Sequence, residues 1–146
     1  MNVNKYTGQC LCGGVAFEVK EIVGPFELCH CTKCRKSTGS AYAAMIGVRS
    51  NGYKITCGLG LIRSFTLPVK ETMPGYSTYF CSRCGSKVPN PQPDSEWFEV
   101  PVGLFDCELP SKPDKHIYVE YAPDWERFYS GIAQYTKSEL KRKRGN

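Results

Sequence analysis

The sequence predicts a mainly antiparallel β domain with one short C-terminal helix. Apolar residues recur in short runs that alternate with polar residues, and turn residues separate these runs. Only residues 137–144 have a helical pattern. Prolines at positions 89, 91 and 93 exclude a central strand at residues 89–93. A chain of 146 residues is long enough to bury one core. We therefore expect a single domain over residues 1–140 and a basic tail over residues 141–146.

The expected elements follow one another with little spacing. Val15, Phe17 and Val19 alternate with polar or small neighbours, which indicates a half-buried strand after a Gly-Gly turn. Residues 26–31 should be extended, residues 31–39 should form a tight turn or helical knuckle, and residues 42–48 should form a buried strand. Asn51-Gly52 is typical of a hairpin turn that leads into a strand at 53–57. Further strands are expected at 62–67, 78–80, 97–102 and 116–121.

Charge and hydropathy exclude several classes of protein. The net charge is +5, but four of the positive charges lie at positions 141–144, and the remaining basic and acidic residues nearly balance. This distribution argues against a nucleic-acid partner. No apolar run approaches the ~20 residues of a membrane span, and the N-terminus lacks the apolar stretch of a secretory signal. We expect a cytoplasmic protein, in which close cysteines bind metals rather than form disulfides.

Seven of the nine cysteines fall into three clusters, and their spacing is typical of metal ligands. The clusters are Cys10-Leu-Cys12, Cys29-His-Cys31-Thr-Lys-Cys34 and Cys81-Ser-Arg-Cys84-Gly85. In an extended segment residues i and i+2 face the same side, so the sulfurs of each Cys-x-Cys pair can converge and His30 should point away. The Cys-x-x-Cys-Gly turn is the usual zinc knuckle. Cys57 and Cys107 stand alone and are expected to be buried apolar thiols.

Spacing alone allows two metal assignments. In the first, Cys10, Cys12, Cys81 and Cys84 form a closed four-thiolate site, and Cys29, Cys31 and Cys34 form a three-thiolate site with one open position. In the second, the Cys31/Cys34 and Cys81/Cys84 turns pair as a zinc ribbon and leave the other three cysteines without a role. Both sites of the first assignment could also be purely structural.

Three motifs together resemble the glutathione-dependent formaldehyde-activating enzyme family, whose domain also occurs in centromere protein V. They are Gly8-Gln-Cys10-Leu-Cys12-Gly13-Gly14, Cys29-His-Cys31-Thr-Lys-Cys34-Arg-Lys-Ser-Thr-Gly39 and Phe80-Cys81-Ser-Arg-Cys84-Gly85. The resemblance implies a β-tent fold of three antiparallel sheets around a structural zinc. It also implies the first assignment, with the structural zinc on Cys10, Cys12, Cys81 and Cys84 and a catalytic zinc on Cys29, Cys31 and Cys34. Because the second site is open, we expect its zinc to be labile. One departure is Thr78, where many members carry Arg.

The activity that this resemblance implies is of the carbon–sulfur lyase type. A thiol such as glutathione would be added to a small aldehyde such as formaldehyde, as in S-(hydroxymethyl)glutathione synthesis. Lys33, Arg35 and Lys36 could hold the carboxylates of the thiol substrate. His116, Asp106 and Glu108 are the nearest candidates for acid–base chemistry, although capping or strand-edge roles fit them as well.

The runner-up function is a non-catalytic, zinc-stabilised binding or chaperone-like module of the same fold. A methionine sulfoxide reductase is a weaker interpretation because Cys107 lacks the expected Arg-x-Cys setting. The oligomeric state does not follow from the sequence.

Overall fold

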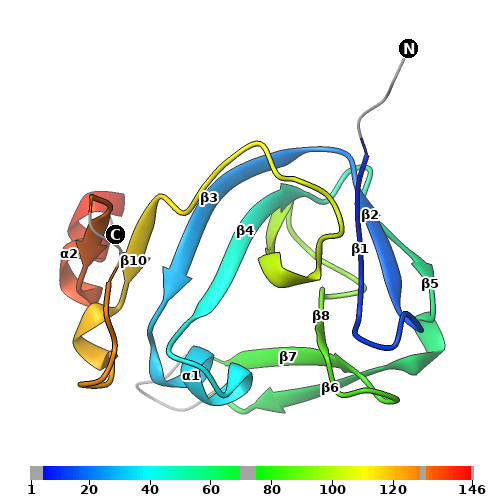
Figure 1. Ribbon diagram of the computed structural model, residues 1–146, viewed down its shortest axis with the longest axis horizontal. Coiled ribbons are helices and arrows are strands. Elements are labelled where there is room, and N and C mark those ends of the chain that lie inside the picture. The colour runs from blue at the N-terminus through cyan, green and yellow to red at the C-terminus, as the bar shows by residue number, and fades with distance from the viewer. Residues whose placement is uncertain (1–4, 70–74, 129–130, 146) are drawn as a thin grey trace.

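Three β-sheets and two α-helices build the computed structural model, which describes residues 5–69, 75–128 and 131–145 (Figure 1). The first sheet has the order β1 (Tyr6–Gln9), β2 (Ala16–Val19), β5 (Lys54–Cys57). The second has the order β11 (Ala133–Tyr135), β10 (Lys115–Ile117), β3 (Ile22–Cys29), β4 (Ala43–Arg49), β9 (Trp97–Pro101). The third has the order β6 (Ile62–Leu67), β7 (Tyr76–Cys81), β8 (Lys87–Val88). The expected mainly β fold of three sheets is confirmed.

Short helices connect and flank these sheets. Helix α1 covers Thr32–Thr38, and α2 covers Lys137–Arg144 as the sequence predicts. Thr136 and Glu139 form a capping box at the start of α2, and Gly145 ends the helix in the left-handed region. The 3₁₀ turns are η1 (Leu59–Leu61), η2 (Val102–Leu104) and η3 (Val119–Tyr121). No helix of the described residues is long and apolar enough to cross a membrane.

Two sequence predictions about strands were wrong. The turn at Ser50–Gly52 forms, with the Tyr53 amide donating to the Ser50 carbonyl at 3.1 Å, but β4 and β5 do not pair as a hairpin. Instead β5 pairs with β2 in the first sheet, so the chain changes sheets at this turn. The strand expected at 116–121 ends at Ile117, because Tyr118 adopts a positive φ of 57° and η3 follows.

The five-stranded sheet has one face on the main core and one face on the pocket described below. Leu28, Ile46 and Val100 belong to the core, together with Phe17 and Val19 of the first sheet. Because successive side chains of a strand alternate, Glu27 and Cys29 of β3 point to the opposite face from Leu28. The neighbours of Glu27 in register are Lys115 and Met45, and those of Cys29 are Ile117 and Ala43.

Strand β10 pairs in parallel with both β3 and β11, whereas the remaining strand pairs are antiparallel. In Figure 1 this arrangement places α2 at the end of the molecule opposite the first sheet. Helix α2 includes part of the segment expected to be a basic tail, and the domain boundary at residue 140 stays a prediction.

Candidate functional site

Four cysteines from two distant segments form the first thiol cluster. Cys10 and Cys12 lie in the turn after β1, Cys81 ends β7, and Cys84 lies in the turn before β8. Their four sulfur atoms all lie within 4.8 Å of one another. The Sγ atoms of Cys10 and Cys12 are 3.6 Å apart, and those of Cys12 and Cys81 are 3.8 Å apart. This is the grouping of the first assignment, and the zinc-ribbon pairing was wrong.

Two sulfur–sulfur distances in the four-thiol cluster, 3.6 and 3.8 Å, are compatible with a zinc site. Four sulfurs at the usual Zn–S distance of about 2.3 Å in a tetrahedron lie about 3.8 Å apart, close to the distances observed. Backbone amides also point at the sulfurs: Val15 donates to Cys10 Sγ at 3.3 Å and Gly14 donates to Cys12 Sγ at 3.4 Å. Such hydrogen bonds stabilise thiolates. The cluster could therefore hold a metal ion and is compatible with zinc.

The second cluster consists of Cys29, Cys31 and Cys34, and its three sulfurs also lie within 4.8 Å of one another. Cys29 ends β3, Cys31 is the N-cap of α1, and Cys34 follows in the first turn with its amide donating to Cys31 Sγ at 3.4 Å. Hydrogen bonds from the thiols of Cys29 and Cys34 lower the pKa of Cys31, because they stabilise its thiolate. Three thiolates could hold a metal ion and leave one tetrahedral corner open.

His30 takes no part in this cluster, as its position between two facing cysteines predicts. Its ring is fully buried, and its Nε2 lies 2.8 Å from Nδ1 of His116. The ring of Phe128 packs against both imidazoles, with centroids 5.0 and 4.8 Å away. Burial and the neighbouring His116 lower the pKa of His30 to about 4, so His30 is neutral at pH 7, and burial also lowers the pKa of His116.

The three-thiol cluster opens on a pocket of about 550 Å³. All three cysteines line the pocket, together with residues of the five-stranded sheet, β7, β8 and α2. Of the three cations expected to hold a substrate, Lys33 lines the pocket, whereas Arg35 and Lys36 are not among its described lining residues. His116, Asp106 and Glu108 are not among them either; His116 is buried, and the other two are exposed.

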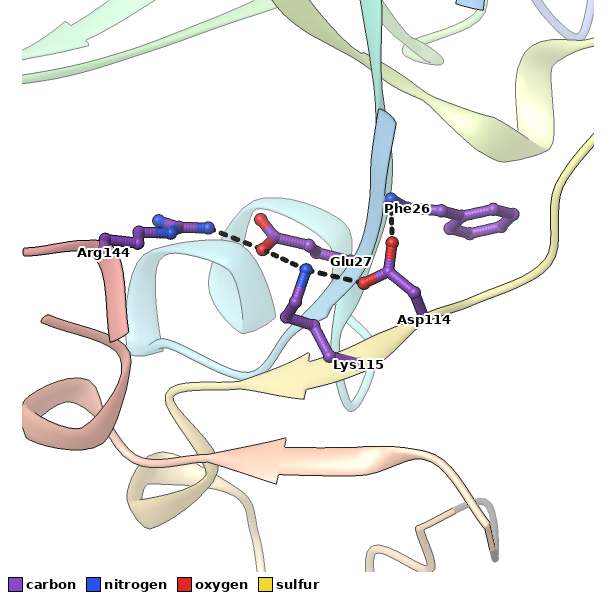
Figure 2. A network of polar contacts seen from close by, with 5 residues as sticks. All are labelled: Phe26, Glu27, Asp114, Lys115 and Arg144. Atoms are coloured by element: carbon purple, nitrogen blue, oxygen red, sulfur yellow. Dashed lines mark hydrogen bonds and ion pairs between the residues drawn. The ribbon is translucent and has the colours of Figure 1, made fainter. Parts of the chain in front are cut away.

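One wall of the pocket carries a buried carboxylate held by two cations (Figure 2). Glu27 is 2% exposed, and its Oε2 lies 2.5 Å from Arg144 of α2 and 3.3 Å from Lys115 Nζ. Lys115 also contacts Asp114 Oδ1 at 2.7 Å, and Asp114 Oδ2 accepts a hydrogen bond from the Phe26 amide at 2.8 Å. This network fixes the end of α2 against β3 and places Arg144 at the pocket.

Glu99 is a second carboxylate of the pocket, carried by β9. Glu99 is exposed to the open pocket, but the surrounding atoms of the pocket limit the hydration of its side chain, and the negative charge of Glu27 lies nearby. Both effects raise the pKa of Glu99, the limited hydration more strongly. Glu99 lies level with Gly47 and Cys29 lies level with Ala43, so four residues of β4, or roughly 13 Å, separate their rows.

Tyr76 and Lys87, which also line the pocket, belong to a polar network next to the three-thiol cluster. Lys87 Nζ donates to Ser37 Oγ at 2.9 Å and to Tyr76 Oη at 3.0 Å, and these two oxygens are 3.1 Å apart. Ser37 lies in α1 and donates to the Cys34 carbonyl at 3.2 Å. The ammonium groups of Lys33 and Lys87 lie 5.9 and 5.7 Å from the centre of the Tyr76 ring. Strand β7, strand β8 and α1 therefore meet at the Tyr76 hydroxyl.

Sequence reasoning missed Glu27, Arg144, Tyr76 and Lys87. Glu27 had one usable signal, because an acid between Phe26 and Leu28 in an expected strand requires a buried partner. The expectation that Cys57 and Cys107 are buried was wrong, since both are exposed. Cys57 ends β5 at the edge of its sheet, and Cys107 follows β9 and η2 in a loop.

Comparison with known proteins identifies a family. Residues 5–121 match the model of a family described as "Glutathione-dependent formaldehyde-activating enzyme". The chain belongs to this family. A relative of the formaldehyde-activating family from Halomonas elongata, named "Putative glutathione-dependent formaldehyde-activating enzyme", is 31% identical over 124 residues, which are 81% of this chain and 77% of the relative. The resemblance read from the cysteine motifs is confirmed.

A solved structure supports the fold of this family member. The crystal structure of a Rhodobacter sphaeroides protein matches with a TM-score of 0.50 and 20% identity, and the match covers 89% of this chain and 99% of that protein. At this identity the likeness shows the fold alone.

Proposed function

We propose that this chain is a zinc-dependent enzyme of the carbon–sulfur lyase type that adds a thiol to a small aldehyde, with glutathione and formaldehyde as the first substrates to test. The observation that carries the proposal is the three-thiol cluster at the wall of a pocket of about 550 Å³. Membership of the formaldehyde-activating family supports the same substrates. In this proposal the four-thiol cluster holds a structural zinc.

The two clusters differ in the way that structural and catalytic zinc sites differ. Cys10, Cys12, Cys81 and Cys84 supply four ligands, and their neighbours Val15 and Val88 belong to a small apolar core. Cys29, Cys31 and Cys34 supply three, and the fourth position would face the pocket. Zinc held there would act as a Lewis acid that lowers the pKa of an incoming thiol.

The residues of the chain would bind and orient the substrates. Lys33 places a positive charge beside the cluster, where it would attract a carboxylate of the thiol substrate. Arg35 and Lys36 stay predicted contributors to substrate binding, although they do not line the described pocket. Partial enclosure by α1, β7 and the five-stranded sheet would limit the access of water.

The decisive experiment measures zinc per chain, glutathione binding and catalysis in the wild type and in a Cys29/Cys31/Cys34→Ser triple variant. We expect two zinc ions in the wild type and one in a folded variant, with loss of glutathione binding. We also expect the wild type alone to accelerate the exchange of formaldehyde between its free and glutathione-bound forms. Unchanged glutathione binding in the triple variant, or no acceleration by the wild type, would instead favour the non-catalytic binding module.

A further inference from the structure

We propose that Tyr76 is the catalytic proton donor of the pocket, with Lys87 and Ser37 as the residues that position it. This inference rests on the proposed function, because it assigns the acid that thiol addition to an aldehyde requires. It starts from the polar network of Tyr76, Lys87 and Ser37, which the cysteine motifs do not predict.

The reaction needs a proton at a defined place. When a thiolate sulfur attacks the aldehyde carbon, a C–S bond forms and the C=O π electrons move to the oxygen. That oxygen must take up a proton to give the neutral hydroxyl of the adduct, and in the reverse direction the hydroxyl must lose it. A donor on the pocket wall near the thiol position would deliver this proton faster than water does.

The hydrogen bonds around Tyr76 leave its proton available for this step. Lys87 carries no acceptor, so it can only donate to the Tyr76 oxygen, at 3.0 Å. The Ser37 hydroxyl hydrogen is directed to the Cys34 carbonyl at 3.2 Å. The phenol hydrogen of Tyr76 can then point either to Ser37 Oγ or to the carbonyl oxygen of an aldehyde bound in the pocket.

The same contacts stabilise Tyr76 after it has given up the proton. The Lys87 ammonium stays within hydrogen-bond distance of the phenolate, and the Lys33 ammonium lies 5.9 Å from the ring centre. Both are fixed positive charges at the place where negative charge develops. The proton that the thiol loses on binding goes to solvent, and solvent returns one to the phenolate, so that each turnover balances.

Position favours Tyr76 over the two carboxylic acids that line the pocket, Glu27 and Glu99. Two successive hydrogen bonds, of 3.1 and 3.2 Å, link its hydroxyl through Ser37 to the backbone of Cys34, a member of the three-thiol cluster. The carboxylate of Glu27 is engaged by Arg144 and Lys115, and Glu99 lies in a row roughly 13 Å from that of Cys29. Tyr76 combines a place in the pocket with a cation that holds its conjugate base.

The test compares Tyr76→Phe with Tyr79→Phe, a loss of hydroxyl on the same strand at a position that does not line the described pocket. The rate is the exchange of formaldehyde with glutathione, measured by proton NMR exchange spectroscopy above the uncatalysed rate. We expect kcat of Tyr76→Phe to fall about 100-fold or more, with KM for glutathione and zinc content within twofold of the wild type. Tyr79→Phe should keep the wild-type kcat.

A second variant covers the case in which Tyr76→Phe does not fold. Lys87→Met removes the cation from the phenol and keeps a side chain of similar length, and kcat should fall about 10-fold with glutathione binding retained. If Tyr76→Phe folds and keeps the wild-type kcat, this inference is overturned and the proposed function stays intact. If only Lys87→Met folds, a wild-type kcat in that variant has the same meaning. A wild type that accelerates nothing while binding zinc and glutathione overturns both.

Discussion

The ion pair between Arg144 of α2 and Glu27 of β3 is expected to contribute measurably to stability. Replacing Arg144 with Met keeps the aliphatic stem and removes the charge that Glu27 contacts. Two unit charges about 4 Å apart at an effective dielectric constant of about 20 attract by about 4 kcal/mol. The Arg144 side chain is 44% exposed, and Lys115 remains beside Glu27 in the variant, so solvent screening and this second cation reduce the loss. We expect Arg144→Met to lower the free energy of unfolding by about 1–2 kcal/mol.

The assay is urea unfolding of the zinc-loaded protein at low salt, with Lys141→Met as the control. Lys141 lies in the same helix, carries the same charge and is exposed, so its loss should cost less than about 0.5 kcal/mol. A double-mutant cycle of Arg144→Met with Glu27→Gln isolates the pair and should give a coupling of about 1 kcal/mol. Equal stabilities of Arg144→Met and Lys141→Met, together with an additive cycle, would refute the reasoning.

Three further predictions concern the pocket, a turn and the four-thiol cluster. Folding raises the pKa of Glu99 above its value in the unfolded chain, so the protein loses stability as the pH rises above about 4.5. Glu99→Gln should therefore stabilise the protein at pH 8 and have little effect at pH 4. Urea unfolding of both proteins at the two pH values checks this. Gly58 has a φ of +80°, and a Cβ there would lie 1.9 Å from the Gly14 carbonyl oxygen. Gly58→Ala should therefore lower the free energy of unfolding by roughly 2–4 kcal/mol, as measured by thermal unfolding. Gly60 has open space around it, so Gly60→Ala should cost under about 0.5 kcal/mol, and equal costs would contradict this. Cys84→Ser should lower the metal content by one ion per chain and destabilise the fold, and mass spectrometry of the native protein showing unchanged content would count against a metal in that cluster.

The cysteine pattern allowed the two thiol clusters to be predicted, whereas most of the pocket around the three-thiol cluster was missed. Cys-x-Cys and Cys-x-x-Cys spacings constrain local geometry strongly, and the resemblance then decided which pairs meet. Alternation of Val15, Phe17 and Val19 with other residues likewise predicted a strand, which the structure has at Ala16–Val19. Patterns of this kind reflect local backbone geometry, so they can be read from a single segment.

Features that depend on long-range pairing could not be predicted in the same way. Strands β1, β8 and β11 have two to four residues each, too few for a periodic signal, and exist because a neighbouring strand supplies their hydrogen bonds. The turn at Asn51-Gly52 was recognised, but its local chemistry does not say which sheet receives the next strand. Tyr76, Lys87 and Ser37 are far apart in sequence, and only the packing of α1 against β7 and β8 brings them together.

Strand β7 connects the pocket directly to the four-thiol cluster. Its first residue, Tyr76, lies at the pocket, and its last, Cys81, belongs to the four-thiol cluster. A six-residue strand is a stiff rod of roughly 20 Å, so anchoring one end restricts the motion of the other. An ion bound by Cys81 would therefore help to hold the Tyr76 hydroxyl in position from the other end of the strand. If both clusters bind zinc as proposed, removing the ion of the four-thiol cluster alone should lower kcat, so activity should not be proportional to total metal content.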